Sequence, residues 1–261
     1  MAQTSDVHRP IIITANWKMY KTIEEAKTFI KTLASLTQQS QATIYLAVPF
    51  TIIQAAVNCA KEHKIPMIVG AQNMNDASEG AFTGEIAARM LIEVGAQFVL
   101  LGHSERRLYF HESNLFINRK IKRALKESLQ PVLCVGETLD EREAGETEMV
   151  IKTQLLQSLE GVNPKELLKL IIAYEPVWAI GTGKNADPIE AQLAHKLIRQ
   201  VIREEWGEEV AMNMVIQYGG SVKPDNVSEL IHQPDIDGLL IGGASLSIDS
   251  FIKIIHGVIP K

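Results

Sequence analysis

The stretch LIIAYEPVWAIGTG, residues 170–183, decides how we interpret the rest of the chain. It opens with an apolar, partly β-branched run, which is typical of a parallel strand buried on both faces. The run ends at Tyr174, and Glu175 and Pro176 follow. Because proline lacks a backbone donor and disfavours helix in the residue before it, the strand should stop there. We therefore expect a carboxylate held at the carboxyl end of a buried strand.

The residues after Glu175 are typical of a lid. An apolar tip that contains Trp178 lies between Pro176 and the flexible residues Gly181 and Gly183. An exposed tryptophan is unfavourable unless the segment closes over something, and closure would exclude water from the carboxylate. The alternative is an ordinary solvated acid at the start of a loop, which is where most glutamates are found.

Length and composition are ordinary for a soluble globular protein, with 261 residues, 46% hydrophobic and 22% charged. No linker or low-complexity tract divides the chain, so we expect a short polar leader over residues 1–10 and a single domain over residues 11–261. No stretch resembles the apolar core of a signal peptide or reaches the roughly 20 apolar residues that span a bilayer. We therefore expect a cytoplasmic protein that has no membrane partner.

Charge and cysteine content exclude other classes of function. The net charge is −5 and no basic cluster is present, so nucleic acid is not an expected partner. Cys59 and Cys134 have neither Cys-x-x-Cys nor Cys/His spacing, which argues against a disulfide framework and against a zinc site. A small anion can still bind where local groups overcome the overall negative charge.

Short apolar runs recur along the chain, each followed by a polar turn and a helical stretch. The runs cover residues 11–15, 43–48, 67–71, 98–101, 131–135, 170–174, 214–217 and 238–241. Dividing 261 residues by eight runs gives about 33 residues per unit, the size of a βα repeat. Amphipathic periodicity predicts helices over residues 23–36, 51–62, 115–129, 148–159, 189–206 and 248–255.

The fold predicted by this pattern is a single (β/α)8 barrel, a closed parallel eight-stranded barrel with an outer ring of helices. Asp187 followed by Pro188 is typical of a helix start. The alternative is an open doubly wound sheet, but that fold requires a glycine-rich turn after an early strand, and none follows residues 11–15.

In such a barrel, functional groups lie just after the strands, at the carboxyl-terminal end. The residues found there are Asn16, Lys18, His103, Glu105, Glu175, Ser221, Gly242 and Gly243. Taken singly, each has a structural explanation, since a lysine is usually a solvated surface charge and paired glycines usually mark a tight turn. Their convergence on one end of a barrel favours a site.

These groups suit one kind of chemistry. The glycine pairs after the last two strands can offer backbone N–H groups to a phosphate. Glu175 can act as a general base on a C–H next to a carbonyl, an effect worth roughly 10² to 10⁴-fold. His103, Asn16 and Lys18 can stabilise the enediolate that forms, at about 3 to 4 kcal/mol per donor. With no metal or cofactor required, the predicted reaction is the isomerisation of a small phosphorylated ketose and aldose.

The chain closely resembles the triosephosphate isomerase family along nearly its whole length. The matching segments are ANWKM (15–19), AQN (71–73), GAFTGE (80–85), GHSERR (102–107), CVGETL (134–139), YEPVWAIGTGK (174–184), YGGSV (218–222) and IGGASL (241–246). Eight segments in the family's order and spacing are highly specific. The resemblance implies interconversion of dihydroxyacetone phosphate and D-glyceraldehyde 3-phosphate through an enediolate.

The resemblance also implies a role for each site residue. Glu175 would be the base, His103 a neutral electrophile, Lys18 the fixed positive charge beside Asn16, and Glu105 the residue that positions the Lys18 ammonium. The implied phosphate-holding residues are Gly181, Ser221, Gly242 and Gly243. The implied lid comprises Pro176, Val177, Trp178, Ala179, Ile180, Gly181, Thr182, Gly183 and Lys184, with Tyr218 and Ser221 as its docking partners.

A homodimer is the expected assembly. The connection over residues 72–84 is long for a link between a strand and a helix. In the family that the chain resembles, this segment projects into the neighbouring subunit, where Thr83 approaches the region of Asn16 and Lys18.

Two rival functions remain open from the sequence. A Schiff-base aldolase on the same barrel needs a lysine near the end of the sixth strand, where this chain has Glu175. A binding protein that has lost catalysis would be expected to lack at least one of Asn16, Lys18, His103 and Glu175, and all four are present.

Overall fold

The computed structural model describes residues 9–34, 42–179 and 186–258. Its strands are β1 (Ile12–Asn16), β2 (Thr43–Val48), β3 (Met67–Ala71), β4 (Phe98–Leu101), β5 (Gln130–Val135), β6 (Ile171–Tyr174), β7 (Val215–Tyr218) and β8 (Gly238–Ile241). Each strand pairs in parallel with the next, and β8 returns to pair with β1, which closes the barrel. The predicted closed parallel barrel is thereby confirmed.

The strand ends differ from the predicted runs by at most one residue. Asn16, for example, pairs with Ala47 and is the last residue of β1, whereas the apolar run ends at Ala15. The reason is that pairing with the neighbouring strand decides where a strand ends, and a polar residue can continue that pairing. The consequence is that Asn16 is held by the barrel itself.

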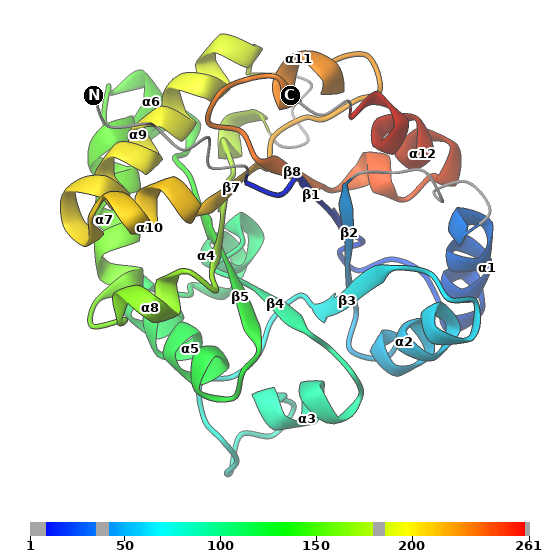
Figure 1. The fold of residues 1–261 in the computed structure, drawn as a ribbon. Helices are drawn as coiled ribbons and strands as arrows, with labels where there is room; N and C mark the ends of the chain where they lie inside the picture. Colours follow the sequence, from blue (N-terminus) through cyan, green and yellow to red (C-terminus); the bar gives the residue numbers. More distant parts are fainter. Residues whose placement is uncertain (1–8, 35–41, 180–185, 259–261) are drawn as a thin grey trace.

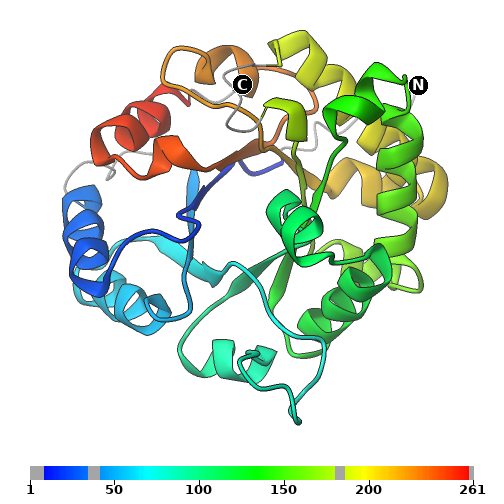
Figure 2. The same ribbon diagram turned by 180° about the vertical axis from the view of Figure 1, so that it is seen from behind.

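Helices form a ring outside the strands (Figures 1 and 2). They are α1 (Ile23–Ala34), α2 (Ile53–Glu62), α3 (Ala88–Glu93), α4 (Ser104–Phe110), α5 (Asn114–Lys126), α6 (Leu139–Glu143), α7 (Thr147–Leu159), α8 (Pro164–Leu167), α9 (Pro188–Trp206), α10 (Glu208–Asn213), α11 (Val227–Ile231) and α12 (Ile248–Gly257), with 3-10 turns η1 (Val177–Ala179) and η2 (Gly243–Ser245). The six predicted helices correspond to α1, α2, α5, α7, α9 and α12. The others are too short to show helical periodicity in the sequence.

The start of α9 shows why the helix begins where the sequence indicates. Asp187 accepts a hydrogen bond from the backbone N–H of Glu190 at 2.7 Å, and Glu190 accepts one from the backbone N–H of Asp187 at 3.1 Å. Pro188 occupies the first turn. Such a reciprocal cap stabilises a helix start by about 1 kcal/mol. It therefore fixes the residue at which α9 begins.

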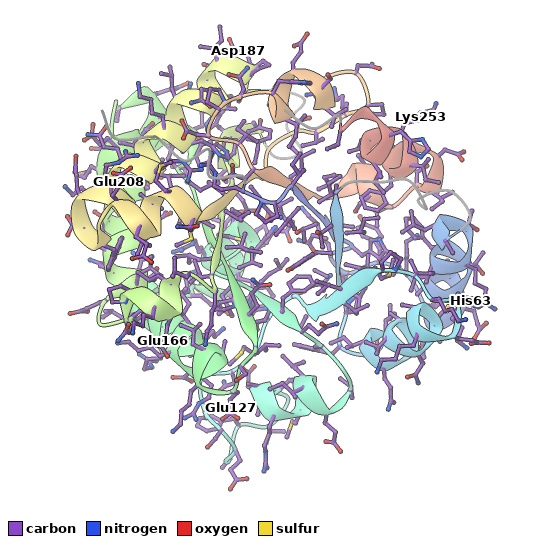
Figure 3. All side chains as sticks on the ribbon, in the orientation of Figure 1. His63, Glu127, Glu166, Asp187, Glu208 and Lys253 are labelled. Atoms are coloured by element: carbon purple, nitrogen blue, oxygen red, sulfur yellow. The ribbon has the colours of Figure 1, made fainter. Side chains whose placement is uncertain are left out.

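The apolar core has two layers, because alternate residues of each strand face opposite sides of the barrel wall. Side chains inside the barrel, among them Phe98, Leu100 and Cys134, form one cluster, and the outward-facing residues pack against the helices in a larger one. Figure 3 shows side chains filling both spaces, while labelled residues such as Glu208 and Lys253 lie at the periphery.

Cys59 and Cys134 are free and buried. Among the helices of the described residues, none is both long and apolar enough to cross a membrane.

Candidate active site

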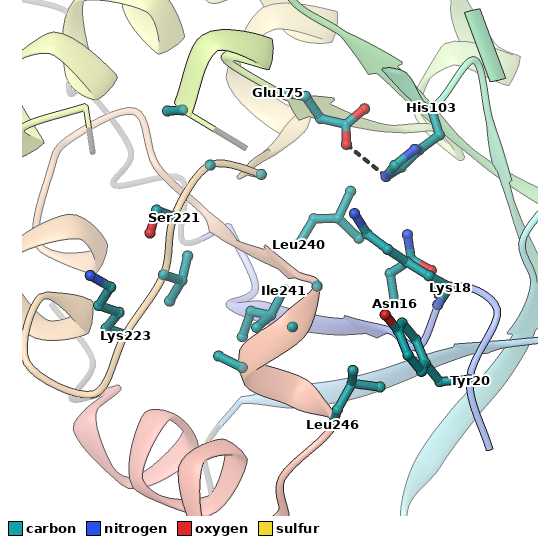
Figure 4. A pocket seen from close by; sticks show the side chains of 17 residues that line it. Asn16, Lys18, Tyr20, His103, Glu175, Ser221, Lys223, Leu240, Ile241 and Leu246 are labelled. Carbon is teal, nitrogen blue, oxygen red and sulfur yellow. Dashed lines mark hydrogen bonds and ion pairs between the residues drawn. The ribbon is translucent and has the colours of Figure 1, made fainter. Parts of the chain in front are cut away.

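A buried carboxylate and an imidazole meet at the carboxyl-terminal end of the barrel (Figure 4). Glu175 follows β6 and is only 2% exposed. Its Oε1 lies 2.9 Å from Nε2 of His103, and its Oε2 accepts a hydrogen bond from the backbone N–H of Ser104 at 3.0 Å. The structure thus brings together two side chains that are 72 residues apart in the sequence (175 − 103).

A glycine on the neighbouring strand end makes room for this carboxylate. Gly219 follows β7, and its backbone N–H donates to the carbonyl of Tyr174 at 2.7 Å. A Cβ at Gly219 would lie 2.9 Å from Cγ of Glu175, closer than real Cβ contacts come. Only glycine at this position allows both the backbone hydrogen bond and the observed place of the Glu175 side chain.

Hydrogen bonding assigns the tautomer of His103. This residue caps the start of α4, and its Nδ1 accepts the backbone N–H of Glu105 at 3.2 Å. Because Nδ1 is an acceptor, the ring hydrogen belongs on Nε2, which donates it to Glu175. A second ring proton would have to displace the Glu105 amide from Nδ1, so this hydrogen bond favours the neutral ring.

The two groups shift each other's pKa. Burial raises the pKa of Glu175, but His103 and the Ser104 amide outweigh burial, so the net pKa is lowered from 4.5. Burial lowers the pKa of His103, but the carboxylates of Glu175 and Glu105 raise it, and the net pKa lies above 6.5. The carboxylates and the Nδ1 hydrogen bond thus act in opposite directions on His103. Glu175 is ionised at neutral pH and can accept a proton.

Lys18 supplies positive charge to the same site from a left-handed turn. Its φ is 49°, a conformation that is uncommon outside glycine. Its Nζ lies 2.6 Å from Oε1 of Glu105, and its backbone N–H donates to Oδ1 of Asn16 at 3.0 Å. Glu105 and Asn16 therefore hold the two ends of this residue.

Gln72 is a further residue that supports this turn, and the sequence alone predicts no role for it. Its Nε2 donates to the carbonyl of Lys18 at 2.8 Å and to Oδ1 of Asn16 at 3.2 Å. The only sequence signal was its place in the matching segment AQN, directly after the third apolar run.

The glycines after β8, Gly242 and Gly243, line a pocket at this end of the barrel. Gly242 directly precedes η2. A Cβ there would lie 3.2 Å from Cε of Lys18. Gly243 begins η2, and the first amides of such a turn lack acceptors within it, so they can bind an anion. Ser221, on the segment after β7, lines the same pocket.

These groups surround a pocket of about 400 Å³. It is lined by Asn16, Lys18, Tyr20, His103, Glu175, Ala179, Gly219, Gly220, Ser221, Val222, Lys223, Leu240, Ile241, Gly242, Gly243, Ala244 and Leu246. Glu105 reaches the pocket through Lys18 instead of lining it. In the described part of the chain, no group of three or more His, Cys, Asp or Glu side chains could hold a metal ion.

The start of the predicted lid is packed against Glu137. Trp178 is 8% exposed, and its Nε1 donates to Oε1 of Glu137 at 3.0 Å. Tyr174 donates its hydroxyl to the same carboxylate at 3.1 Å, and the guanidinium of Arg142 lies 4.3 Å from the centre of the Trp178 ring. The tryptophan is therefore covered by protein in this structure. Glu137 is a second residue for which the sequence alone predicts no role, although it lies in the matching segment CVGETL.

Other predicted lid residues lie outside the described residues. They are Ile180, Gly181, Thr182, Gly183 and Lys184, so the structure gives no position for the predicted phosphate contact of Gly181. Pro176, Val177, Trp178 and Ala179 are described, and Ala179 lines the pocket.

Thr83 is exposed on the long segment between β3 and α3, which projects from the barrel (Figures 1 and 2). The base of the segment is closed by Asn75, which donates its backbone N–H to the carbonyl of Ile86 at 2.8 Å and its side-chain amide to Glu85 at 2.7 Å. Thr83 lines neither of the pockets that Lys18 borders. Its predicted contact with that region is not made within one chain and stays a prediction about an assembly of two chains.

A closed parallel barrel with ionisable groups gathered at its carboxyl-terminal end defines the class of (β/α)8-barrel enzymes. The sequence profile of the triosephosphate isomerase family matches residues 11–258. This chain belongs to the triosephosphate isomerase family.

Individual triosephosphate isomerases are similar in sequence to this chain over nearly their whole length. A triosephosphate isomerase of Protochlamydia amoebophila is 56% identical over 97% of this chain and 95% of its own length. Triosephosphate isomerases of Carboxydothermus hydrogenoformans and Chloroflexus aurantiacus are 48% and 47% identical, over 96% and 94% of this chain and 100% and 98% of their own lengths.

Proposed function

We propose that this chain interconverts dihydroxyacetone phosphate and D-glyceraldehyde 3-phosphate, the reaction of its family. The observation that carries the proposal is the contact of 2.9 Å between the buried Glu175 carboxylate and His103, in a pocket that Lys18 and the Gly242 turn also line. This pocket offers a base and a hydrogen-bond donor with positive charge beside them, and backbone amides at the Gly242 turn.

In this proposal, Glu175 takes a proton from the carbon beside the substrate carbonyl. The C–H electron pair forms a carbon–carbon double bond, and the carbonyl pair moves to oxygen to give an enediolate. His103 stabilises this oxygen through its Nε2–H and passes the hydroxyl proton between the two oxygens. Glu175 then returns its proton to the neighbouring carbon, so no atom is gained or lost.

The remaining site residues hold the substrate. Lys18, positioned by Glu105 and beside Asn16, directs positive charge at the phosphate and at the developing oxyanion. We assign the phosphate to backbone groups of Gly181, Ser221, Gly242 and Gly243. Closure of residues 176–184, with Tyr218 and Ser221 as docking partners, would exclude water and so protect the enediolate from loss of phosphate.

We further propose a homodimer in which the segment around Thr83 enters a second pocket of the partner subunit. That pocket has a volume of about 370 Å³ and is lined by Asn16, Lys18, Met19, Pro49, Phe50, Gln72, Asn73, His103, Glu105, Arg106 and Phe110. Met19 is 93% exposed, Phe110 61% and Phe82 52%. Exposed apolar side chains at a largely apolar cleft, together with the exposed Phe82 on the projecting segment, support an interface between subunits.

A substitution in the projecting segment tests the dimer. Phe82→Asp should shift sedimentation toward the monomer and lower turnover with it, whereas Met149→Asp on α7, a side chain of similar exposure at 57%, should leave both unchanged. A Phe82→Asp protein that stays dimeric at micromolar concentration would contradict this assembly.

Turnover of purified protein on D-glyceraldehyde 3-phosphate, coupled to detection of dihydroxyacetone phosphate, tests the reaction. We expect fast turnover that falls only on strong dilution. A folded protein without turnover would favour the binding protein that has lost catalysis. A cytoplasmic location accompanies the proposal, in keeping with the glycolytic reaction of the family.

A further inference from the structure

A second lysine borders the catalytic pocket, and the reaction described above does not use it. Lys223 lies on the segment between β7 and α11 and lines the pocket together with Ser221. Figure 4 shows Lys18 and Lys223 on opposite sides of the pocket, with Ile241 between them in that view. The pocket thus has a lysine on each side.

The backbone that carries Lys223 is held in place. The side-chain oxygen of Asn226 accepts the backbone N–H of Lys223 at 2.8 Å, and the side-chain amide of Asn226 donates to the carbonyl of Ser221 at 3.0 Å. One asparagine therefore ties Lys223 to Ser221, a predicted phosphate-holding residue. The side chain of Lys223 itself is exposed.

The charges of the two lysines are compensated differently. Lys18 has the Glu105 carboxylate at 2.6 Å, which cancels much of its charge at a distance. Lys223 has no carboxylate within ion-pair distance among the residues that the structure describes. The whole chain carries a net charge of −5, so a phosphate dianion meets a repulsive field at long range. An uncompensated ammonium at the pocket opposes that repulsion where the substrate must enter.

We propose that Lys223 is a phosphate-capturing residue, whose ammonium draws the dianionic phosphate end of the substrate into the pocket before the backbone amides bind it. The inference deepens the proposed function and rests on it. Lys223 would raise the rate at which substrate associates, so its loss should lower kcat/KM. The rate of proton transfer to Glu175 should not change. Such steering is screened by salt, because the Debye length falls from about 30 Å at 0.01 M to about 3 Å at 1 M ionic strength.

The test is the salt dependence of a Lys223→Gln variant. At about 0.01 M ionic strength we expect kcat/KM to fall roughly 3 to 10-fold with kcat little changed, and the difference from wild type to disappear near 1 M. Lys223→Arg should restore kcat/KM. The matched control is Lys165→Gln on α8, which precedes β6 and so lies toward the amino-terminal end of the barrel, and which removes the same charge from an exposed lysine.

Two further measurements separate capture from a structural role. Turnover of D-glyceraldehyde, which lacks the phosphate, should be equal in wild type and Lys223→Gln. The affinity for inorganic phosphate, measured by calorimetry, should weaken by a factor similar to the loss in kcat/KM. The phosphate measurement does not depend on turnover, so it tests Lys223 even if the proposed reaction fails.

Two sets of results would contradict phosphate capture by Lys223. A loss that persists at 1 M salt, or that appears equally with D-glyceraldehyde, would assign Lys223 a structural role. An unchanged kcat/KM at low salt, or an equal effect of Lys165→Gln, would show that a charge at this position does not capture substrate.

Discussion

The side-chain amide of Gln72 donates a hydrogen bond of 2.8 Å to the backbone carbonyl of Lys18. Lys18 has a positive φ, so its backbone is held in a conformation that a lysine rarely adopts unaided. The same amide reaches Oδ1 of Asn16. Gln72 therefore fixes the turn that places the Lys18 ammonium in the pocket.

Substituting Gln72 should lower activity although it need not touch substrate. Loss of two hydrogen bonds at about 1 kcal/mol each predicts that kcat/KM of Gln72→Ala falls roughly 10 to 30-fold. Steady-state kinetics alongside a circular dichroism spectrum check this. Gln72→Glu, which keeps the shape but loses the donor, should lose as much. Normal kcat/KM in both variants would show that the turn at Lys18 keeps its conformation without Gln72.

Gly219→Ala should move the carboxylate of Glu175, the proposed base. The added Cβ would lie 2.9 Å from Cγ of Glu175 and 3.1 Å from the carbonyl oxygen of Tyr174, and the backbone oxygen cannot yield easily. Because a displacement of about 1 Å at a catalytic group can cost 10²-fold, we expect kcat to fall on the order of 100-fold while the protein still folds. The thermal midpoint serves as the control for folding. A variant with wild-type kcat would mean that Glu175 acts from a different position.

The lowered pKa of Glu175 predicts how its contribution to stability depends on pH. Burial opposes ionisation, but His103 and the Ser104 amide more than compensate, so the folded state favours the carboxylate relative to the unfolded chain. A group of this kind stabilises above its unfolded pKa, about 4.3 for glutamate, and the contribution is lost as pH falls through the lower folded pKa.

The measurement is the difference in unfolding free energy between wild type and Glu175→Gln in urea, at one protein concentration. Below pH 4.5 this difference should shift against the wild type. Between pH 7 and pH 5 it should shift in favour of the wild type, because the Glu175 carboxylate raises the pKa of His103 and this effect is lost in Glu175→Gln. A shift against the wild type that begins well above pH 5 would mean that burial dominates and the folded pKa of Glu175 is raised.

A buried ion pair beside the second pocket predicts a large effect on stability. Lys120 is 0% exposed, and its Nζ lies 2.7 Å from Oε1 of Glu112 and 2.8 Å from Oδ1 of Asn73. Lys120→Met leaves a buried carboxylate with Arg106 as its remaining partner, at 2.5 Å. We expect a loss of about 3 kcal/mol in unfolding free energy, measured in urea. The double variant Lys120→Met/Glu112→Leu should recover part of it. Equal losses in both proteins would point to packing as the cause.

The barrel could be predicted from the sequence because its strands are buried on both faces. Each strand is then a continuous apolar run, such as residues 98–101, and is visible without knowledge of its neighbours. The long helix α9 could be located for a similar local reason, since Asp187 and Pro188 mark its start. Short helices such as α8 and α10 are held by packing of one or two turns and carry no such local pattern.

The site could be predicted only in part. Glu175 and His103 follow strands directly, so the topology of a barrel is enough to bring them to one end. Gln72 and Glu137 act by orienting other groups, and that role depends on distances to Lys18 and Trp178 that no local pattern records. The close approach of Gly242 to the Lys18 side chain likewise becomes evident only from the structure.

Turnover of Glu175→Gln shows whether Glu175 is the base of an isomerase. Glutamine keeps the size of the side chain but cannot accept a proton from carbon. We predict that the variant binds inorganic phosphate as the wild type does, while its kcat on D-glyceraldehyde 3-phosphate falls by about 10² to 10⁴-fold. A correctly folded Glu175→Gln protein with turnover near that of the wild type would mean that Glu175 is not the base.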